Sequence, residues 1–121
     1  MKISAAYNNG EVFGHFGRTE QFAVYQIEEG NIISREIKGN DGLSHADLVN
    51  LLASWNVDIL FVGGIGSHAI DLLKMKGIEV YTGVTGEVEK NVIDYLNGNL
   101  NHNPAMVHQY KPLFPSSLIN R

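Results

Sequence analysis

The sequence contains no cysteine among its 121 residues. This absence excludes disulfides, thiolate nucleophiles and cysteine-held zinc or iron–sulfur centres, because each of them needs a thiol side chain. Proline is scarce as well, and all three prolines lie in the last 18 residues, at positions 104, 112 and 115. No apolar run is long enough to span a bilayer and the first residues lack a signal-peptide pattern, so we expect a cytoplasmic protein with no membrane partner.

Basic residues are in the minority. There are 9 Lys and Arg against 13 Asp and Glu, which gives a formal net charge of −4 with neutral histidines. Because proteins bind nucleic acids largely through clustered Lys and Arg, this balance argues against a nucleic-acid partner. A hydrophobic share of 44% with 18% charged residues is typical of a folded globular domain.

Residues 1–98 show the periodic patterns of an α/β domain, and residues 99–121 do not. Alternating or continuous apolar runs predict strands at 2–7, 22–28, 32–38, 58–62 and 78–82. Helical spacing predicts helices that begin near Ser44, near Ser67 and at residue 87. The order β-β-β-α-β-α-β-α predicts a mixed five-stranded sheet whose first three strands are antiparallel and whose later crossovers are parallel. Residues 99–121 are predicted to form an irregular or mobile tail.

The predicted topology brings several loops to one edge of the sheet, because strands that run in the same direction end at the same edge. Those loops are 8–18, 39–45, 63–68 and 83–87. Open α/β sheets bind ligands outside the carboxyl ends of their strands. Three of the five histidines, His15, His45 and His68, fall in these loops, so we expect the binding site there.

Two glycine-rich loops and several shorter motifs carry a resemblance to a known family. In order, they are Gly14-His15-Phe16-Gly17-Arg18, His45 at a helix start, Val62-Gly63-Gly64-Ile65-Gly66, Lys76-Gly77-Ile78-Glu79-Val80 and Asn97-Gly98-Asn99-Leu100. Over roughly residues 1–100 the chain resembles the dinitrogenase iron–molybdenum cofactor biosynthesis family. Relatives in that family include the NifX and NafY proteins and the C-terminal part of NifB.

The resemblance implies a ribonuclease H-like, three-layer α/β fold without nuclease activity. Family members near nitrogenase bind the iron–molybdenum cofactor or an iron–sulfur cluster precursor and carry it between metal-cluster assembly and acceptor proteins. By position, His15 matches the family's loop histidine and His45 its histidine before the first helix, so both are predicted metal ligands. The predicted cofactor-binding residues are Gly14, His15, Phe16, Gly17, Arg18, His45, Gly63, Gly64 and Gly66.

Plainer structural roles stand beside these predictions. His15 could hydrogen-bond its own turn, and Arg18 could form a surface ion pair with Glu11 or Glu20. For His68 at a helix start we favour a side chain that faces water over a metal ligand. His102 and His108 are assigned no role. Without cysteine, a cluster would be bound by only one or two imidazoles. Such weak binding suits a carrier that releases its cluster better than it suits a scaffold on which a cluster is built.

Other function classes find weaker support. Gly64 to Ala69 fits the G-x-G-x-x-A fingerprint, but the chain lacks the second half of a dinucleotide-binding domain. The first predicted strand has no carboxylate for two-metal nuclease chemistry and no G-x-S-x-G elbow is present, so no enzyme activity is predicted. The alternative is a small anion- or nucleotide-binding regulatory module that uses the Gly63–Gly66 loop and the following helix N-terminus. A third possibility is an interaction domain whose tail docks on a partner.

Overall fold

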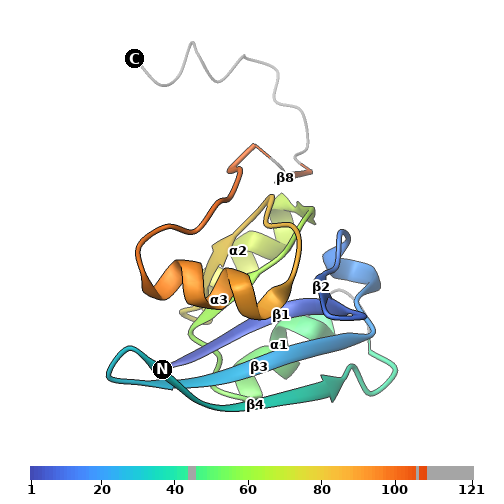
Figure 1. The fold of residues 1–121 in the computed structure, drawn as a ribbon. Helices are drawn as coiled ribbons and strands as arrows, with labels where there is room; N and C mark the ends of the chain where they lie inside the picture. The colour runs from blue at the N-terminus through green and yellow to red at the C-terminus, as the bar shows by residue number, and fades with distance from the viewer. Residues whose placement is uncertain (44–45, 106, 109–121) are drawn as a thin grey trace.

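The computed structural model describes residues 1–43, 46–105 and 107–108, and Figure 1 traces the chain from the N-terminus to the C-terminus. The strands are β1 (Lys2–Asn8), β2 (Glu11–Val12), β3 (Gln21–Glu28), β4 (Asn31–Gly39), β5 (Ile59–Phe61), β6 (Ile65–Gly66), β7 (Glu79–Tyr81) and β8 (Val107–His108). The helices are a 3-10 turn η1 (Phe16–Arg18) and the α-helices α1 (Ala46–Ser54), α2 (Ser67–Met75) and α3 (Val88–Leu96).

The main sheet has the strand order β4-β3-β1-β5-β7. Strand β1 pairs antiparallel with β3 and parallel with β5, while β4 is antiparallel to β3 and β7 is parallel to β5. These pairings confirm the predicted mixed α/β sheet. The short strand β2 adds a sixth member beside β1, and β6 and β8 form a separate two-stranded sheet. The ribonuclease H-like classification and the domain boundary after residue 98 stay predictions.

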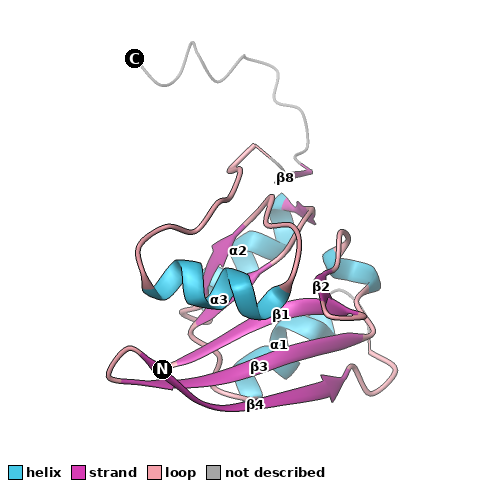
Figure 2. Ribbon diagram, in the orientation of Figure 1, coloured by secondary structure: helices cyan, strands magenta, loops and turns pink. Residues whose placement is uncertain are grey.

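The sheet is covered by α3 on one face and by α1 and α2 on the other, so the domain has three layers (Figure 2). Strand β5 shows why both faces are buried. Leu60 belongs to the core cluster that contains Leu52 of α1, whereas Phe61 belongs to the cluster that contains Val92 of α3. Because successive side chains of a strand point to opposite faces, a continuous apolar run is the pattern that such a central strand needs.

The helices end close to where the sequence predicts. Gly77 after α2 and Gly98 after α3 both have φ +76°, the left-handed conformation that glycine adopts at helix ends without steric cost. The predicted cap Ser44 lies outside the described residues. None of the helices in the described part of the chain is long and apolar enough to cross a membrane.

Candidate functional site

The loops that follow β1, β5 and β7 meet at one edge of the sheet, as the strand directions predict. The amide of Gly83 donates to the carbonyl oxygen of Gly63 at 2.7 Å, which joins the loops after β7 and β5. The amide of Val12 donates to the carbonyl oxygen of Gly86 at 2.9 Å, which joins the loops after β1 and β7. The edge is therefore a hydrogen-bonded assembly of loops, which gives its side chains defined positions.

A glycine seam holds the loop after β1 against the loop after β5. The amide of Gly64 donates to the carbonyl oxygen of Gly14 at 2.8 Å, and the amide of Phe16 donates to the carbonyl oxygen of Gly64 at 3.0 Å. A Cβ atom on Gly63 would lie only 2.8 Å from the Cα atom of Gly14. The two backbones can approach this closely because residue 63 has no side chain. We call the contact between Gly14 and Gly63 the glycine seam.

The seam predicts a specific cost for a methyl group at residue 63. Gly63→Ala is expected to lower the free energy of unfolding by about 1–3 kcal/mol, the usual cost of overpacking a tight contact. Gly14→Ala is the matched control, since nothing lies within 4 Å of a Cβ atom there. Urea unfolding of both variants measures the difference. Equal stabilities would show that the seam does not require glycine at residue 63.

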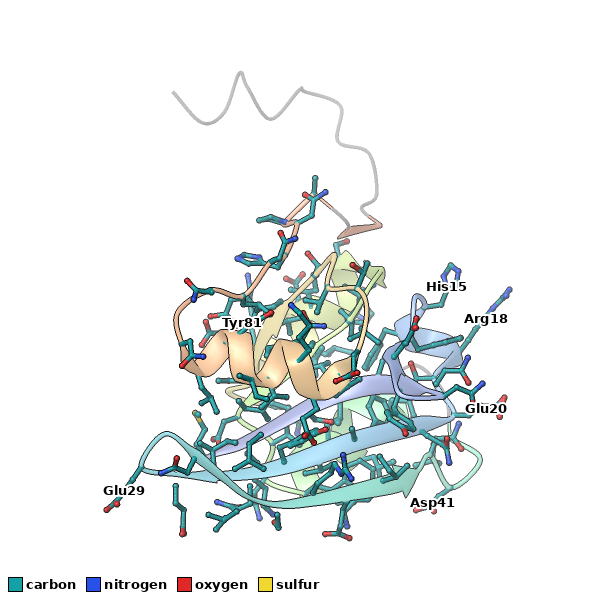
Figure 3. All side chains as sticks on the ribbon, viewed as in Figure 1. His15, Arg18, Glu20, Glu29, Asp41 and Tyr81 are labelled. Atoms are coloured by element: carbon teal, nitrogen blue, oxygen red, sulfur yellow. The ribbon has the colours of Figure 1, made fainter. Side chains whose placement is uncertain are left out.

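Beside the seam lies a pocket of about 320 Å³, here called the His15 pocket. It is lined by His15, Phe16, Gly17, Arg18, Gly64, Ile65, Gly66, His68, Ala69 and Leu72. Phe16 is buried and packs against Phe22, so it forms a fixed wall, whereas His15 and Arg18 are exposed. Figure 3 shows these two side chains on the same side of the molecule, projecting away from the sheet.

Six of the nine predicted site residues line this pocket, and two of the others, Gly14 and Gly63, do not. Gly14 and Gly63 form the seam and bring the two loops together, so the close backbone contact at Gly63 is made to the protein itself. His45, the second predicted metal ligand, lies outside the described residues. The loop that precedes it is attached to the site's edge through Asn40, whose side-chain amide donates to the carbonyl oxygen of Thr19 at 3.0 Å.

His68 lines the pocket although it is not among the predicted site residues. It is exposed, as expected for a helix start, but it also lines the pocket that His15 lines. The β-bridge between His15 and Gly64 places the loop of one histidine directly beside the start of the helix that carries the other. The sequence predicts that both residues lie at one edge of the sheet. The missing information was the glycine seam, which sets how closely the two loops approach.

The described lining of the His15 pocket includes a cation and no anion, although the protein is acidic. The described lining contains one guanidinium and two imidazoles but no carboxylate, although the chain carries a formal charge of −4. Helix α2 begins at the pocket with Gly66 as its N-cap, a residue with no side chain to satisfy the first amides. The positive end of a helix dipole and an Arg fork both favour bound anions. The arrangement is therefore suited to an anionic ligand.

Whether the pocket can hold a metal ion depends on how many donor side chains line it. Within the ranges that the structure describes, no three His, Asp or Glu side chains are grouped so that they could hold a metal ion. A closed structural site for a single ion needs about four protein ligands, and the pocket does not provide them. The two imidazoles of the described lining are therefore only a partial set of metal ligands.

A second hollow, of about 410 Å³, lies on the α3 side of the sheet. Among its lining residues, the hydroxyl of Tyr25 and the guanidinium of Arg35 both donate to Oε1 of Glu89, at 3.3 and 2.8 Å. Burial raises the pKa of the Tyr25 hydroxyl. Its described lining contains no histidine and no predicted site residue, so we place the candidate site in the smaller His15 pocket.

The comparisons with known proteins agree with this architecture. The family model for "Dinitrogenase iron-molybdenum cofactor" matches residues 1–98. An uncharacterized protein of Methanocaldococcus jannaschii, MJ0580, is 32% identical over 105 residues, which cover 83% of this chain and 89% of that protein. The crystal structure of PH0822 superposes with a TM-score of 0.81 at 27% identity and covers 86% of this chain and 96% of that one.

A further structural relative shows the fold alone. The apo form of the orange protein from Desulfovibrio gigas has a TM-score of 0.71 at 24% identity, covering 85% of this chain and 92% of its own. The family match extends over all of the main sheet and the three α-helices. It confirms the resemblance that the glycine-rich loops carry. The chain belongs to the dinitrogenase iron-molybdenum cofactor family.

Proposed function

We propose that this protein binds a preassembled iron–molybdenum or related iron–sulfur cluster in the His15 pocket and carries it without catalysis. The cluster is a cargo, received from an assembly protein and passed to an acceptor. The observation that supports this proposal is the lining of the pocket. Its described part combines two imidazoles, one guanidinium and the start of α2, and it has no carboxylate that would repel an anionic cluster.

Each part of the pocket has a separate task in this proposal. The imidazoles of His15 and His68 are ligands for metal atoms exposed on the cluster. The fork of Arg18 pairs with sulfide or with a carboxylate attached to the cluster. The apolar side chains of Phe16 and Leu72 shape the pocket and exclude water. Thiolates, the usual permanent ligands of iron–sulfur clusters, are absent from the chain. The pocket therefore binds the cluster weakly enough for transfer.

The alternative of a nucleotide-binding module is less well supported. A phosphate-binding loop needs backbone amides that point at the ligand. Here the amide of Gly63 donates to the carbonyl oxygen of Phe13 at 3.2 Å, and the amide of Gly64 donates to Gly14. Two of the amides in the proposed phosphate loop are thus used to join the protein's own loops.

The proposal predicts that the protein retains the cluster during anaerobic gel filtration. Purified protein mixed with isolated iron–molybdenum cofactor should elute with iron, molybdenum and visible absorption in the protein peak. Elution of all the metal apart from the protein would contradict the proposal. A thermal-shift series with nucleotides is the companion measurement, because any ligand that binds the native state raises its stability. Stabilisation by a nucleotide but not by the cofactor would favour the alternative.

A further inference from the structure

The chain beyond α3 lies against the domain as a strap, which we define as residues 99–105 together with β8. The strap leaves α3 with the amide of Asn99 donating to the carbonyl oxygen of Asp94 at 2.7 Å. Leu100 then packs against the core cluster on the α3 face. The ring of His102 meets the ring of Tyr81 edge-on, with 5.0 Å between centroids. These contacts bring the strap from the end of α3 to the end of β7.

Asn103 is the main anchor of the strap. Its amide donates to the carbonyl oxygen of Thr82 at 2.7 Å, and the hydroxyl of Thr82 donates back to the carbonyl oxygen of Asn103 at 2.7 Å. Thr82 itself is buried. A Cβ atom on Gly83 would lie 2.5 Å from Cβ of Asn103, so the strap occupies space that a side chain at residue 83 would fill.

From this anchor the strap continues to the candidate site. Strand β8 pairs parallel with β6, with Val107 opposite Ile65 and His108 opposite Gly66. Figure 1 shows this course, from the end of α3 to the small sheet beside the start of α2. Both residues of β6 line the His15 pocket. The strap therefore holds the strand that forms one wall of the pocket.

The strap is also linked to the loop after β5, through the loop after β7. Gly83, which packs against Asn103, donates its amide to the carbonyl oxygen of Gly63. Residues 101–105 are exposed. Within the described residues, the strap is attached by a few hydrogen bonds, by the side chain of Leu100, by the contact of His102 with Tyr81 and by the pairing of β8 with β6. Segments with few buried contacts open locally at a much smaller free-energy cost than global unfolding. The strap can therefore leave without unfolding the sheet.

We propose that the strap is a removable support of β6, a strand that lines the His15 pocket, and that it slows release of the cargo while it is docked on β6. This proposal builds on the proposed function, because it describes how the same pocket keeps and releases its cluster. With the strap docked, Ile65 and Gly66 are held by a neighbouring strand. With the strap released, β6 loses that neighbour and the pocket opens on the side of α2.

Two glycine variants distinguish an effect on the strap from a general effect on the loop after β7. Gly83 and Gly86 lie in the same loop with φ +65° and +85°, so alanine introduces comparable backbone strain at either position. Only at residue 83 does the new Cβ atom collide with the strap, since nothing lies within 4 Å at residue 86. Gly83→Ala is the test variant and Gly86→Ala its control.

The first measurement uses the protein without cofactor. Amide hydrogen exchange at Asn103 and in β6 is expected to accelerate about tenfold or more in Gly83→Ala relative to Gly86→Ala, because the strap's local opening becomes easier. Unchanged exchange in β6 while Asn103 accelerates would overturn the proposal, since the strap would not hold the pocket wall. Unchanged exchange at both places would overturn it too. This result does not depend on whether the protein binds a cluster.

The second measurement follows release of bound iron–molybdenum cofactor after rapid anaerobic desalting. We expect release from Gly83→Ala to be about threefold to tenfold faster than from Gly86→Ala, as local opening gives access to the pocket. Equal release rates, with the strap shown to be open by exchange, would overturn the proposal while leaving the binding site intact. Failure of both variants and the wild type to bind cofactor would instead contradict the proposed function.

Discussion

Replacement of both His15 and His68 by alanine is expected to lower the affinity for iron–molybdenum cofactor by about 100-fold or more, since even the outer partners of metal ligands contribute about 10–100-fold. Each single replacement should lower it by about tenfold. The two histidines line one pocket, and their imidazoles are the strongest metal ligands in its described lining. Anaerobic titration of the cofactor's visible absorption with each variant measures the loss.

Two controls make this result specific. Lys74→Ala removes an exposed side chain from the far end of the helix that carries His68, so its affinity should equal that of the wild type. The double replacement His15→Asn with His68→Asn keeps polar side chains of similar size but removes the imidazoles, so it should lose as much affinity as the alanine pair. Wild-type affinity in the double alanine variant would remove both histidines from the site.

Phe61→Ala is expected to lower the free energy of unfolding by about 3–5 kcal/mol, the usual cost of deleting a fully buried aromatic ring. Phe61 is 0% exposed in the central strand β5. Its ring lies 6.0 Å from the ring of Tyr81 and 5.8 Å from the ring of Tyr95, measured between centroids. The ring therefore joins β5 to both β7 and α3, and its loss leaves a cavity at the centre of that face. Urea unfolding at equilibrium measures the change.

Ile33→Ala is the control for this prediction, because Ile33 is 54% exposed on strand β4. Its stability should stay within about 0.5 kcal/mol of the wild type, as is usual for surface positions. Phe61→Leu should fall between the two, since it keeps part of the buried volume. A loss below about 1 kcal/mol for Phe61→Ala would show that the α3 face of the sheet is packed differently.

The regular elements were predictable because each has a strong local pattern. The apolar run at 58–62 predicts a central strand, and β5 is one, buried on both faces. The helical stripe that begins near Ser67 predicts α2, and Gly77 predicts its end. By contrast, the two-residue strands β2, β6 and β8 have no periodicity of their own. They exist because folding brings their backbones beside other strands, which a local pattern cannot show.

The candidate site, too, could be predicted from the sequence only in part. Strand directions were enough to predict that the loops carrying His15 and His68 share one edge. The glycine seam could not be predicted, because it depends on how two irregular loops pack backbone against backbone. The sequence favours a side chain that faces water for His68; the structure finds His68 exposed and also lining the same pocket as His15. The predicted role of His45 as a ligand stays a prediction.

The central claim is that the cargo binds between the loop after β1 and the start of α2. Amide hydrogen exchange of the wild-type protein, measured anaerobically with and without iron–molybdenum cofactor, tests it most directly. The account predicts that the cofactor slows exchange at residues 15–18 and 64–69, which carry the pocket's lining. Slowed exchange confined to the hollow around Tyr25 and Glu89, or no change anywhere along the chain, would contradict it.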